Sequence, residues 1–222
     1  MSKILVWDLP LRLFHWLLVM LVVVSVVSAK IGGNAMQVHM LSGYTILTLV
    51  LFRILWGFAG STHARFASFV RGPAAVIAYL RGLTGHEAGQ HLGHNPAGAW
   101  SVILMLAALL LQAATGLFAN DDISTEGPLA KLVSKALSDR ITGVHHLNVK
   151  LLFALIALHL SAVAFYLIHK RENLVKPMLT GFKDADNSAG DVAQKRGKTW
   201  LAAVLLAACA GGVYLLLRLP AA

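Results

Sequence analysis

The chain has 222 residues, of which 57% are hydrophobic and only 13% are charged, and its formal net charge is +9. A soluble domain usually carries about 25% charged residues, and the apolar residues here fall in blocks of roughly twenty, enough to cross a bilayer. The composition therefore excludes an ordinary soluble protein and predicts an all-α integral membrane bundle. The positive charge then indicates loops that face anionic lipid rather than a nucleic-acid partner.

The first predicted span covers about Leu9 to Ala29. Pro10 suits its first turn, where the missing N–H of proline costs nothing. Arg12 and His15 are three residues apart, so they lie on one side of the helix, close to the membrane entry. The segment has no small-residue cleavage site and is not expected to be a cleaved signal.

The second predicted span covers about Met36 to Phe58, with His39 near its start and Arg53 near its end. These two residues are fourteen apart, so they share one face of the helix. Gly43 follows His39 by one turn and marks a place where a flat ligand could approach the backbone.

A polar connection follows from Gly60 to Asn95, and a short amphipathic helix is predicted at Pro73 to Leu83. The spacing of His86, His91 and His94, written H-x4-H-x2-H, could hold a metal ion. A solvated loop on the cytoplasmic side is the favoured interpretation, and the stretch is also a candidate quinone site.

The third predicted span, about Ala97 to Phe118, opens with Asn95 as a helix N-cap and Pro96 in the first turn. It contains no ionisable residue, so we expect a packing role. The loop from Ala119 to Gly143 is polar, and a short helix is predicted within it at Pro128 to Leu137.

The fourth predicted span, Val144 to Lys170, contains four histidines, and polar groups at membrane depth favour a functional site. His145 and His159 are fourteen residues apart, which on a helix is about 40° short of four full turns and a rise of about 21 Å. They therefore share one face near opposite ends of the apolar slab. His146 would be misaligned with His159 by about 140°, and His169 is expected to reach the interface.

Residues Arg171 to Thr199 are polar and are expected to form a mobile connection to a fifth span, about Trp200 to Leu217. The lysines and arginines divide thirteen to six when the N-terminus is placed inside. The predicted topology is therefore a multi-pass protein of the bacterial inner membrane, with a cytoplasmic N-terminus and a periplasmic C-terminus.

The predicted depths match the histidines in two pairs, His39 with His145 near the outer surface and His15 with His159 near the inner surface. Each pair brings two imidazoles from different helices toward one point, which favours the axial ligation of two haem irons. Zinc fits less well, because zinc needs three or four ligands around one point. No C-x-x-C-H motif is present, so any haem is not attached covalently.

Arg12 and Arg53 lie at the predicted inner end, where they could bind the propionates of the inner haem. They could alternatively be interfacial anchors only. Met36 or Met40 as an axial ligand is a weaker alternative.

Four motifs stand out: V-W-D-L-P-L-R-L-F-H-W, Q-V-H-M-L-S-G-Y, L-G-H-N-P-A-G-A and V-H-H-L…A-L-H-L-S-A-V. As a set they resemble the bacterial cytochrome b561 family, which includes the b-type cytochrome subunits of nickel–iron hydrogenases. The resemblance covers about residues 4 to 182. It implies a four-helix bundle with two b haems and axial ligands at His15, His39, His145 and His159. The chain departs from the family's commonest form in having a second histidine, His146, directly after a ligand position.

This resemblance implies electron transfer between the quinone pool and a dehydrogenase, a hydrogenase or a c-type cytochrome. We expect a di-haem domain at residues 1–182, then a polar linker and a fifth transmembrane helix at 183–222. The resemblance leaves open whether the chain is itself an enzyme. A second copy of the chain, forming a homodimer, is a further candidate partner.

The alternative function is a superoxide/quinone oxidoreductase that acts directly on a small substrate. The slightly acidic loop before the fourth span disfavours an anionic substrate there. A haem-free transporter with a histidine relay would need acidic partners inside the spans, and the sequence has none.

Overall fold

The computed structural model describes the chain except for residues 1, 84–91, 124, 186–196 and 220–222. Within the described residues, five helices are long and apolar enough to cross a membrane. They are α1 (Leu9–Ile31), α2 (Ala35–Ala59), α5 (Pro96–Gly116), α6 (Lys135–Ile168) and α8 (Thr199–Arg218). The predicted helical membrane bundle is confirmed.

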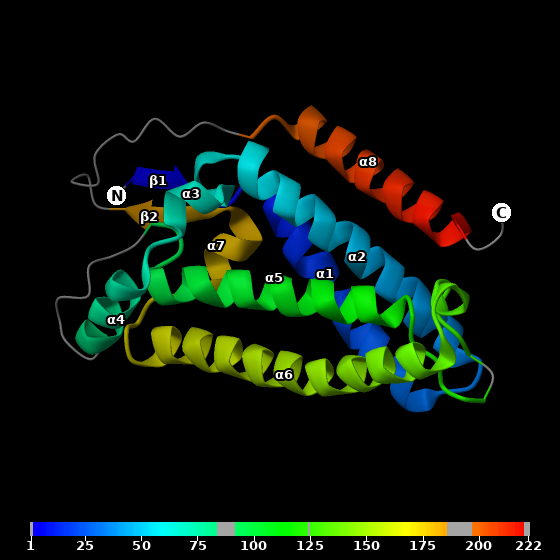
Figure 1. Cartoon of the computed structure of the whole chain (residues 1–222). Helices are drawn as coiled ribbons and strands as arrows, with labels where there is room; N and C mark the ends of the chain where they lie inside the picture. The colour runs from blue at the N-terminus through cyan, green and yellow to red at the C-terminus, as the bar shows by residue number, and fades with distance from the viewer. Residues whose placement is uncertain (1, 84–91, 124, 186–196, 220–222) are drawn as a thin grey trace.

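Helix α2 is the centre of the bundle, because it packs against α1, α5 and α8 (Figure 1). Its side chains Val50 and Trp56 are completely buried. Helix α6 packs along α5 at the edge of the bundle and, within the described residues, has no comparably extensive contact with α1 or α2.

The long helices alternate in direction, which gives the bundle two distinct ends (Figure 1). The strand end carries β1 (Ser2–Leu5), β2 (Phe182–Ala185), α3 (Phe66–Phe69), α4 (Pro73–Gly82) and α7 (Val175–Thr180). The loop end carries the α1–α2 turn and the α5–α6 connection. The described chain starts at the strand end and finishes at the loop end, as expected for five spans.

At the strand end, β1 pairs antiparallel with β2 and so joins the start of the described chain to the segment that follows α7. Gly181 connects α7 to β2 with φ +90°, a conformation that favours glycine. Its carbonyl oxygen accepts the backbone N–H of Val6 at 2.8 Å and of Trp7 at 3.1 Å. The start of α1 is therefore fixed against a segment far away in the sequence.

Asp8 begins α1 as an N-cap and is buried. Its Oδ1 accepts the backbone N–H of Leu11 at 2.8 Å, and its Oδ2 accepts the indole N–H of Trp56 at 3.1 Å. Both carboxylate oxygens thus have partners, and the same side chain joins α1 to α2.

The start of α6 differs from the prediction. The helix begins at Lys135 rather than near Val144, because Ser134 caps it by accepting the N–H of Leu137 at 3.3 Å. The predicted separate helix at 128–137 is therefore wrong: the described residues form a short 3-10 turn, η2 (Ala130–Leu132), and residues 135–137 already belong to α6.

The two polar connections contain more structure than their composition indicates. The predicted amphipathic helix at Pro73 to Leu83 is confirmed as α4, and a 3-10 turn, η1 (Thr62–Ala64), precedes α3. The expectation of a mobile connection after Arg171 is wrong for residues 175–185, since α7 and β2 form there and β2 pairs with β1.

Helix α8 belongs to the packed core. Its buried side chains Ala202 and Cys209 join the cluster built on α1 and α2, and Val213 joins a second cluster with Leu47 of α2. The predicted boundary between residues 182 and 183 falls inside β2.

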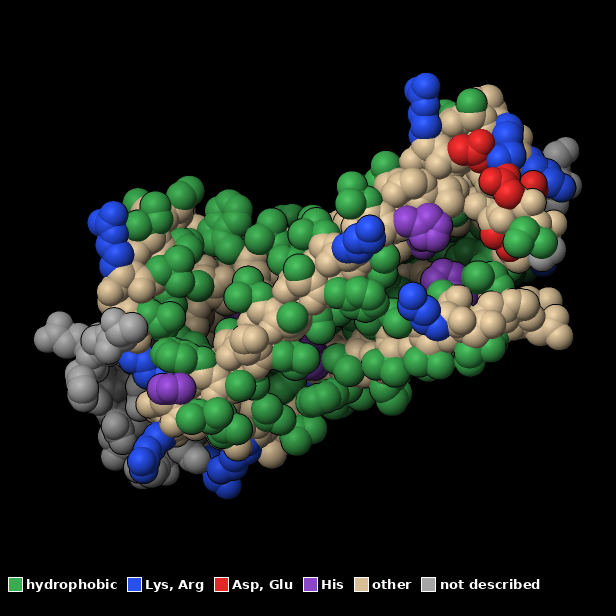
Figure 2. Space-filling model, turned by 90° about the horizontal axis from the view of Figure 1, so that it is seen from below, with side chains coloured by type: hydrophobic (Ala, Val, Ile, Leu, Met, Phe, Trp, Pro, Cys, Tyr) green, Lys and Arg blue, Asp and Glu red, His purple; other side chains and the backbone are tan. Residues whose placement is uncertain are grey.

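The surface has the pattern of a membrane protein. Figure 2 shows a face on which hydrophobic side chains predominate, with basic side chains toward both ends and acidic side chains gathered at one end. The acidic residues Asp122 and Asp139 both form ion pairs with Lys135 at the start of α6.

Candidate functional site

The structure brings His39 of α2 and His145 of α6 together at the loop end. Their ring centres are 6.2 Å apart and their planes are nearly perpendicular, at 87°. Two metal–imidazole bonds of about 2 Å, each extended by about 1.1 Å to the ring centre, would separate the centres by about 6 Å. The pair therefore has the spacing of two imidazoles that share one metal ion.

Both rings are oriented by backbone carbonyl oxygens. His39 Nδ1 lies 2.9 Å from the carbonyl oxygen of Ser25, and His145 Nδ1 lies 3.0 Å from that of Gln112. A carbonyl oxygen can only accept, so each Nδ1 carries the proton and each Nε2 keeps its lone pair. This arrangement is the one in which a metal-bound histidine is usually held.

Hydroxyl groups add to each of these contacts. Ser25 Oγ lies 3.0 Å from His39 Nδ1, and Thr115 Oγ1 lies 3.1 Å from His145 Nδ1. One turn beyond His145, the buried Asn148 donates to the carbonyl oxygen of Ala108 at 2.9 Å. Helix α5, predicted only to pack, therefore orients a candidate ligand.

His145 and His146 have different surroundings. The His146 side chain is exposed, with its ring centre 6.2 Å from that of His145, whereas the ring of the less exposed His145 is paired with that of His39. His145, and not His146, thus faces α2.

The second predicted pair, His15 of α1 and His159 of α6, lies toward the strand end. The two imidazoles are close enough for their charges to interact. His15 Nδ1 is buried and has no hydrogen-bond partner among the described residues. A buried imidazole nitrogen without a partner is costly, which fits a site that a cofactor completes.

Two glycines adjoin the loop-end pair. A Cβ atom on Gly43 would meet nothing within 4 Å, whereas a Cβ on Gly116 would lie 3.1 Å from Cε1 of His145. The absence of a side chain at Gly116 lets the His145 ring lie against α5, and the space beside Gly43 suits a flat group.

The two predicted arginines are both at the strand end, but their environments differ. Arg12 donates from Nη1 to the carbonyl oxygen of Leu179 at 2.5 Å, which ties α1 to α7, and its Nε is buried without a partner among the described residues. Arg53 is almost completely buried, at 2% exposed, and its guanidinium lies 5.0 Å from the centre of the Phe66 ring.

His94, which sequence reasoning left in a solvated loop, lies near Arg53, and His63 lies beside Gly93, the residue that precedes His94. Burial lowers the pKa of His63, and burial together with the nearby charge of Arg53 lowers the pKa of His94 to about 3. Both imidazoles are therefore neutral near pH 7. The other two histidines of the predicted metal-binding spacing, His86 and His91, lie outside the described residues.

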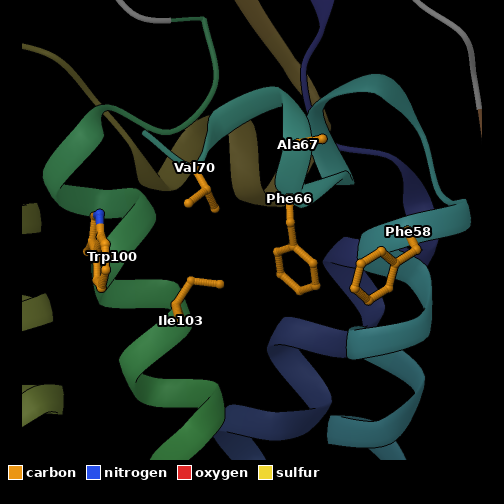
Figure 3. A pocket seen from close by; sticks show the side chains of 6 residues that line it. All are labelled: Phe58, Phe66, Ala67, Val70, Trp100 and Ile103. Atoms are coloured by element: carbon orange, nitrogen blue, oxygen red, sulfur yellow. The ribbon is translucent and has the colours of Figure 1, made fainter. Parts of the chain in front are cut away.

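An apolar groove opens on the surface at the strand end (Figure 3). Its volume is about 340 Å³, and Phe58 and Phe66 line it opposite Trp100 and Ile103 of α5, with Ala67 and Val70 beside them. The Phe66 ring also lies over Arg53, so one aromatic side chain adjoins both the groove and the buried guanidinium.

Sequence reasoning missed Ser25, Gln112 and Thr115, and it placed His63 and His94 in or beside a solvated loop. A weak signal existed for His94, since it precedes the helix-capping Asn95-Pro96 pair and so had to lie close to the start of α5. No sequence signal could identify the carbonyl oxygens that orient His39 and His145, because every residue has a carbonyl group.

Among the described residues, no group of three or more His, Cys, Asp or Glu side chains could hold a metal ion. Pairs of imidazoles fit a metal ion whose remaining ligands come from a planar cofactor. The residues present thus fit haem in their donor chemistry, ring spacing and orientation.

Comparison with known proteins agrees with this chemistry. The family model for prokaryotic cytochrome b561 matches residues 6–181. The chain is 25% identical to a probable Ni/Fe-hydrogenase B-type cytochrome subunit of Azotobacter chroococcum mcd 1, covering 82% of this chain and 89% of that protein. It is 22% identical to the protein of the same name in Rhizobium leguminosarum bv. viciae, covering 84% and 92%. No solved structure matches the chain significantly.

Proposed function

Since the chain belongs to the prokaryotic cytochrome b561 family, we propose that it is a di-haem b-type cytochrome that carries electrons across the membrane between the quinone pool and a redox partner. Membrane electron transfer through haem b is the shared activity of the family. The presence of two haems, their histidine ligands and the exchange with quinone are the further parts of this proposal.

The loop-end histidine pair carries the proposal. His39 and His145 have the spacing of two axial ligands, and each directs its Nε2 lone pair away from the carbonyl oxygen that holds Nδ1. We assign one haem to this pair and a second to His15 and His159. The fourteen-residue separation on α6 supports the second site, at a rise of about 21 Å.

Haem, when bound, supplies an iron that takes up and releases one electron. Two imidazoles of the chain would hold that iron, and a haem held in this way favours electron transfer over the binding of a substrate. Ser25 and Gln112 fix the two rings through their carbonyl oxygens, so little reorganisation accompanies a change of charge. These roles favour electron transfer over catalysis on a small molecule.

The redox partner follows from the relatives and from the length of α6. The relatives are named as hydrogenase subunits, so a hydrogenase is the first candidate partner here, before another dehydrogenase or a c-type cytochrome. The 34 residues of α6 extend about 51 Å, more than the roughly 30 Å apolar slab. Its first turns therefore project beyond the membrane at the loop end and offer a surface for a partner.

The predicted topology would put the strand end in the cytoplasm and the loop end in the periplasm. Quinone would exchange electrons near one haem at the interface. Of the candidate stretch from His86 to His94, the structure describes only the last residues, and His94 itself lies beside the buried Arg53.

Haem content tests the proposal directly. Purified protein is expected to contain two non-covalent b haems per chain and to show reduced b-type absorption bands, with both irons low-spin when oxidised. A pyridine haemochrome assay against protein concentration measures the ratio. A chain without haem, or with a single haem, would contradict the di-haem assignment.

Gly116 offers a finer test of the loop-end site. Gly116→Ala places a Cβ atom 3.1 Å from the present position of His145 Cε1, so the ring must shift by a few tenths of an ångström. We expect a changed low-spin electron paramagnetic resonance signal for one haem while the other signal stays the same. Gly212→Ala is the matched control, since its Cβ would meet nothing within 4 Å. If the Gly116→Ala and Gly212→Ala proteins gave the same resonance spectrum, Gly116 would not adjoin a haem.

A further inference from the structure

Several nitrogens toward the strand end are buried without hydrogen-bond partners among the described residues, and three of them belong to neighbouring side chains: Arg53 Nη1, His63 Nε2 and His94 Nδ1. Each such group costs stability unless something accepts from it or donates to it. Their concentration in one place calls for a common explanation, because native structures rarely leave several buried polar atoms unsatisfied together.

The three side chains form one cluster. His63 Nδ1 would lie 3.2 Å from a Cβ atom on Gly93, so its ring is beside the residue that precedes His94. Arg53, His63 and His159 are all close enough to His94 to affect the protonation of its imidazole. The cluster is therefore next to the strand-end histidine pair.

The His94 ring is held rigidly in this place. Its centre lies 4.7 Å from that of Trp7 and 4.6 Å from that of Phe69. Arg53 is held against Phe66. Side chains fixed by aromatic neighbours are pre-organised donors, which lose little entropy when a ligand binds.

Among the described residues, no side chain or backbone group accepts a hydrogen bond from Arg53 Nη1. Asp8 is the carboxylate that contributes to the electrostatic environment of Arg53. Its two oxygens already accept from Leu11 and from Trp56. A guanidinium is always charged, and a buried charge without a full set of partners is strongly unfavourable.

A guanidinium in one cluster with two imidazoles can bind a carboxylate, since all three can donate hydrogen bonds and the arginine supplies the opposite charge. We propose that Arg53, His63 and His94 form an anion pocket that binds a propionate of the strand-end haem, with His63 and His94 as positioning residues. This inference rests on the proposed function, because it needs a haem between His15 and His159.

The pocket has a consequence for the haem potential. An ionised propionate favours the oxidised iron, and donors that neutralise the propionate weaken this effect. Loss of a donor should therefore lower the midpoint potential of the strand-end haem and leave the loop-end haem unchanged.

The test is a spectroelectrochemical titration of the full chain. His94→Leu and Arg53→Met are expected to retain both haems and to lower one of the two midpoint potentials, whereas His94→Gln, which keeps an N–H donor, should shift it less. His169→Leu is the control at the same end, since its side chain is exposed. The His145→Ala protein, which should hold only the strand-end haem, identifies the haem that shifts.

Reconstitution with haem dimethyl ester isolates the propionate. With both carboxylates esterified, His94→Leu should no longer differ from the wild-type chain. A persistent difference, a shift of the loop-end haem, or unchanged potentials in both His94→Leu and Arg53→Met would each overturn the anion pocket while leaving the di-haem function intact. A chain that binds no haem would refute the proposed function instead.

Discussion

His145→Ala is expected to reduce the haem content from two per chain to one, whereas His146→Ala should retain both haems. His145 lies 6.2 Å from His39 between ring centres and is oriented by the Gln112 carbonyl oxygen. The His146 side chain is exposed. The neighbouring substitution is thus a control of equal size, one residue away, in the same turn of α6.

The remaining haem in His145→Ala should keep its own absorption and resonance signals, because its proposed ligands lie about four turns away along α6. His39→Ala, a substitution on α2, should also leave a chain that contains only this one haem. The haemochrome assay and the resonance spectrum measure both effects. If His146→Ala lost a haem and His145→Ala kept both, the ligand would be His146 and not His145.

His15→Ala and His159→Ala are each expected to remove the other haem. The physical reason is the same, because the iron loses one of its two axial imidazoles and the alanine side chain cannot replace it. His169→Ala, near the end of the same helix, should retain both haems. If His15→Ala and His145→Ala removed the same haem, the pairing of ligands by depth would be wrong.

Loss of either haem should also interrupt transfer across the membrane. In liposomes that contain trapped ferricyanide, external dithionite should reduce it through the wild-type chain and through His146→Ala and His169→Ala. The variants that lack one haem should show only the background rate, because the remaining haem cannot span the roughly 30 Å slab alone. Undiminished transfer in a one-haem variant would contradict a relay through both sites.

The sequence by itself determined the class of the molecule and the pairing of its histidines by depth. Blocks of about twenty apolar residues can only be buried in a bilayer as helices, and α6 must place His145 and His159 on one face because the helical repeat is regular. The five spans and the α4 helix follow from such local rules, as does the Asn95 cap, which accepts the N–H of Gly98 at 2.7 Å.

Tertiary structure alone decided what surrounds these side chains. The choice between His145 and His146 depends on the direction in which α6 faces α2, and the carbonyl oxygens that orient the rings come from α1 and α5. The cluster of Arg53, His63 and His94 unites α2, η1 and the chain before α5, which no spacing in the sequence connects. A periodic pattern encodes the face of one helix, whereas the contents of a buried site depend on how several helices pack together.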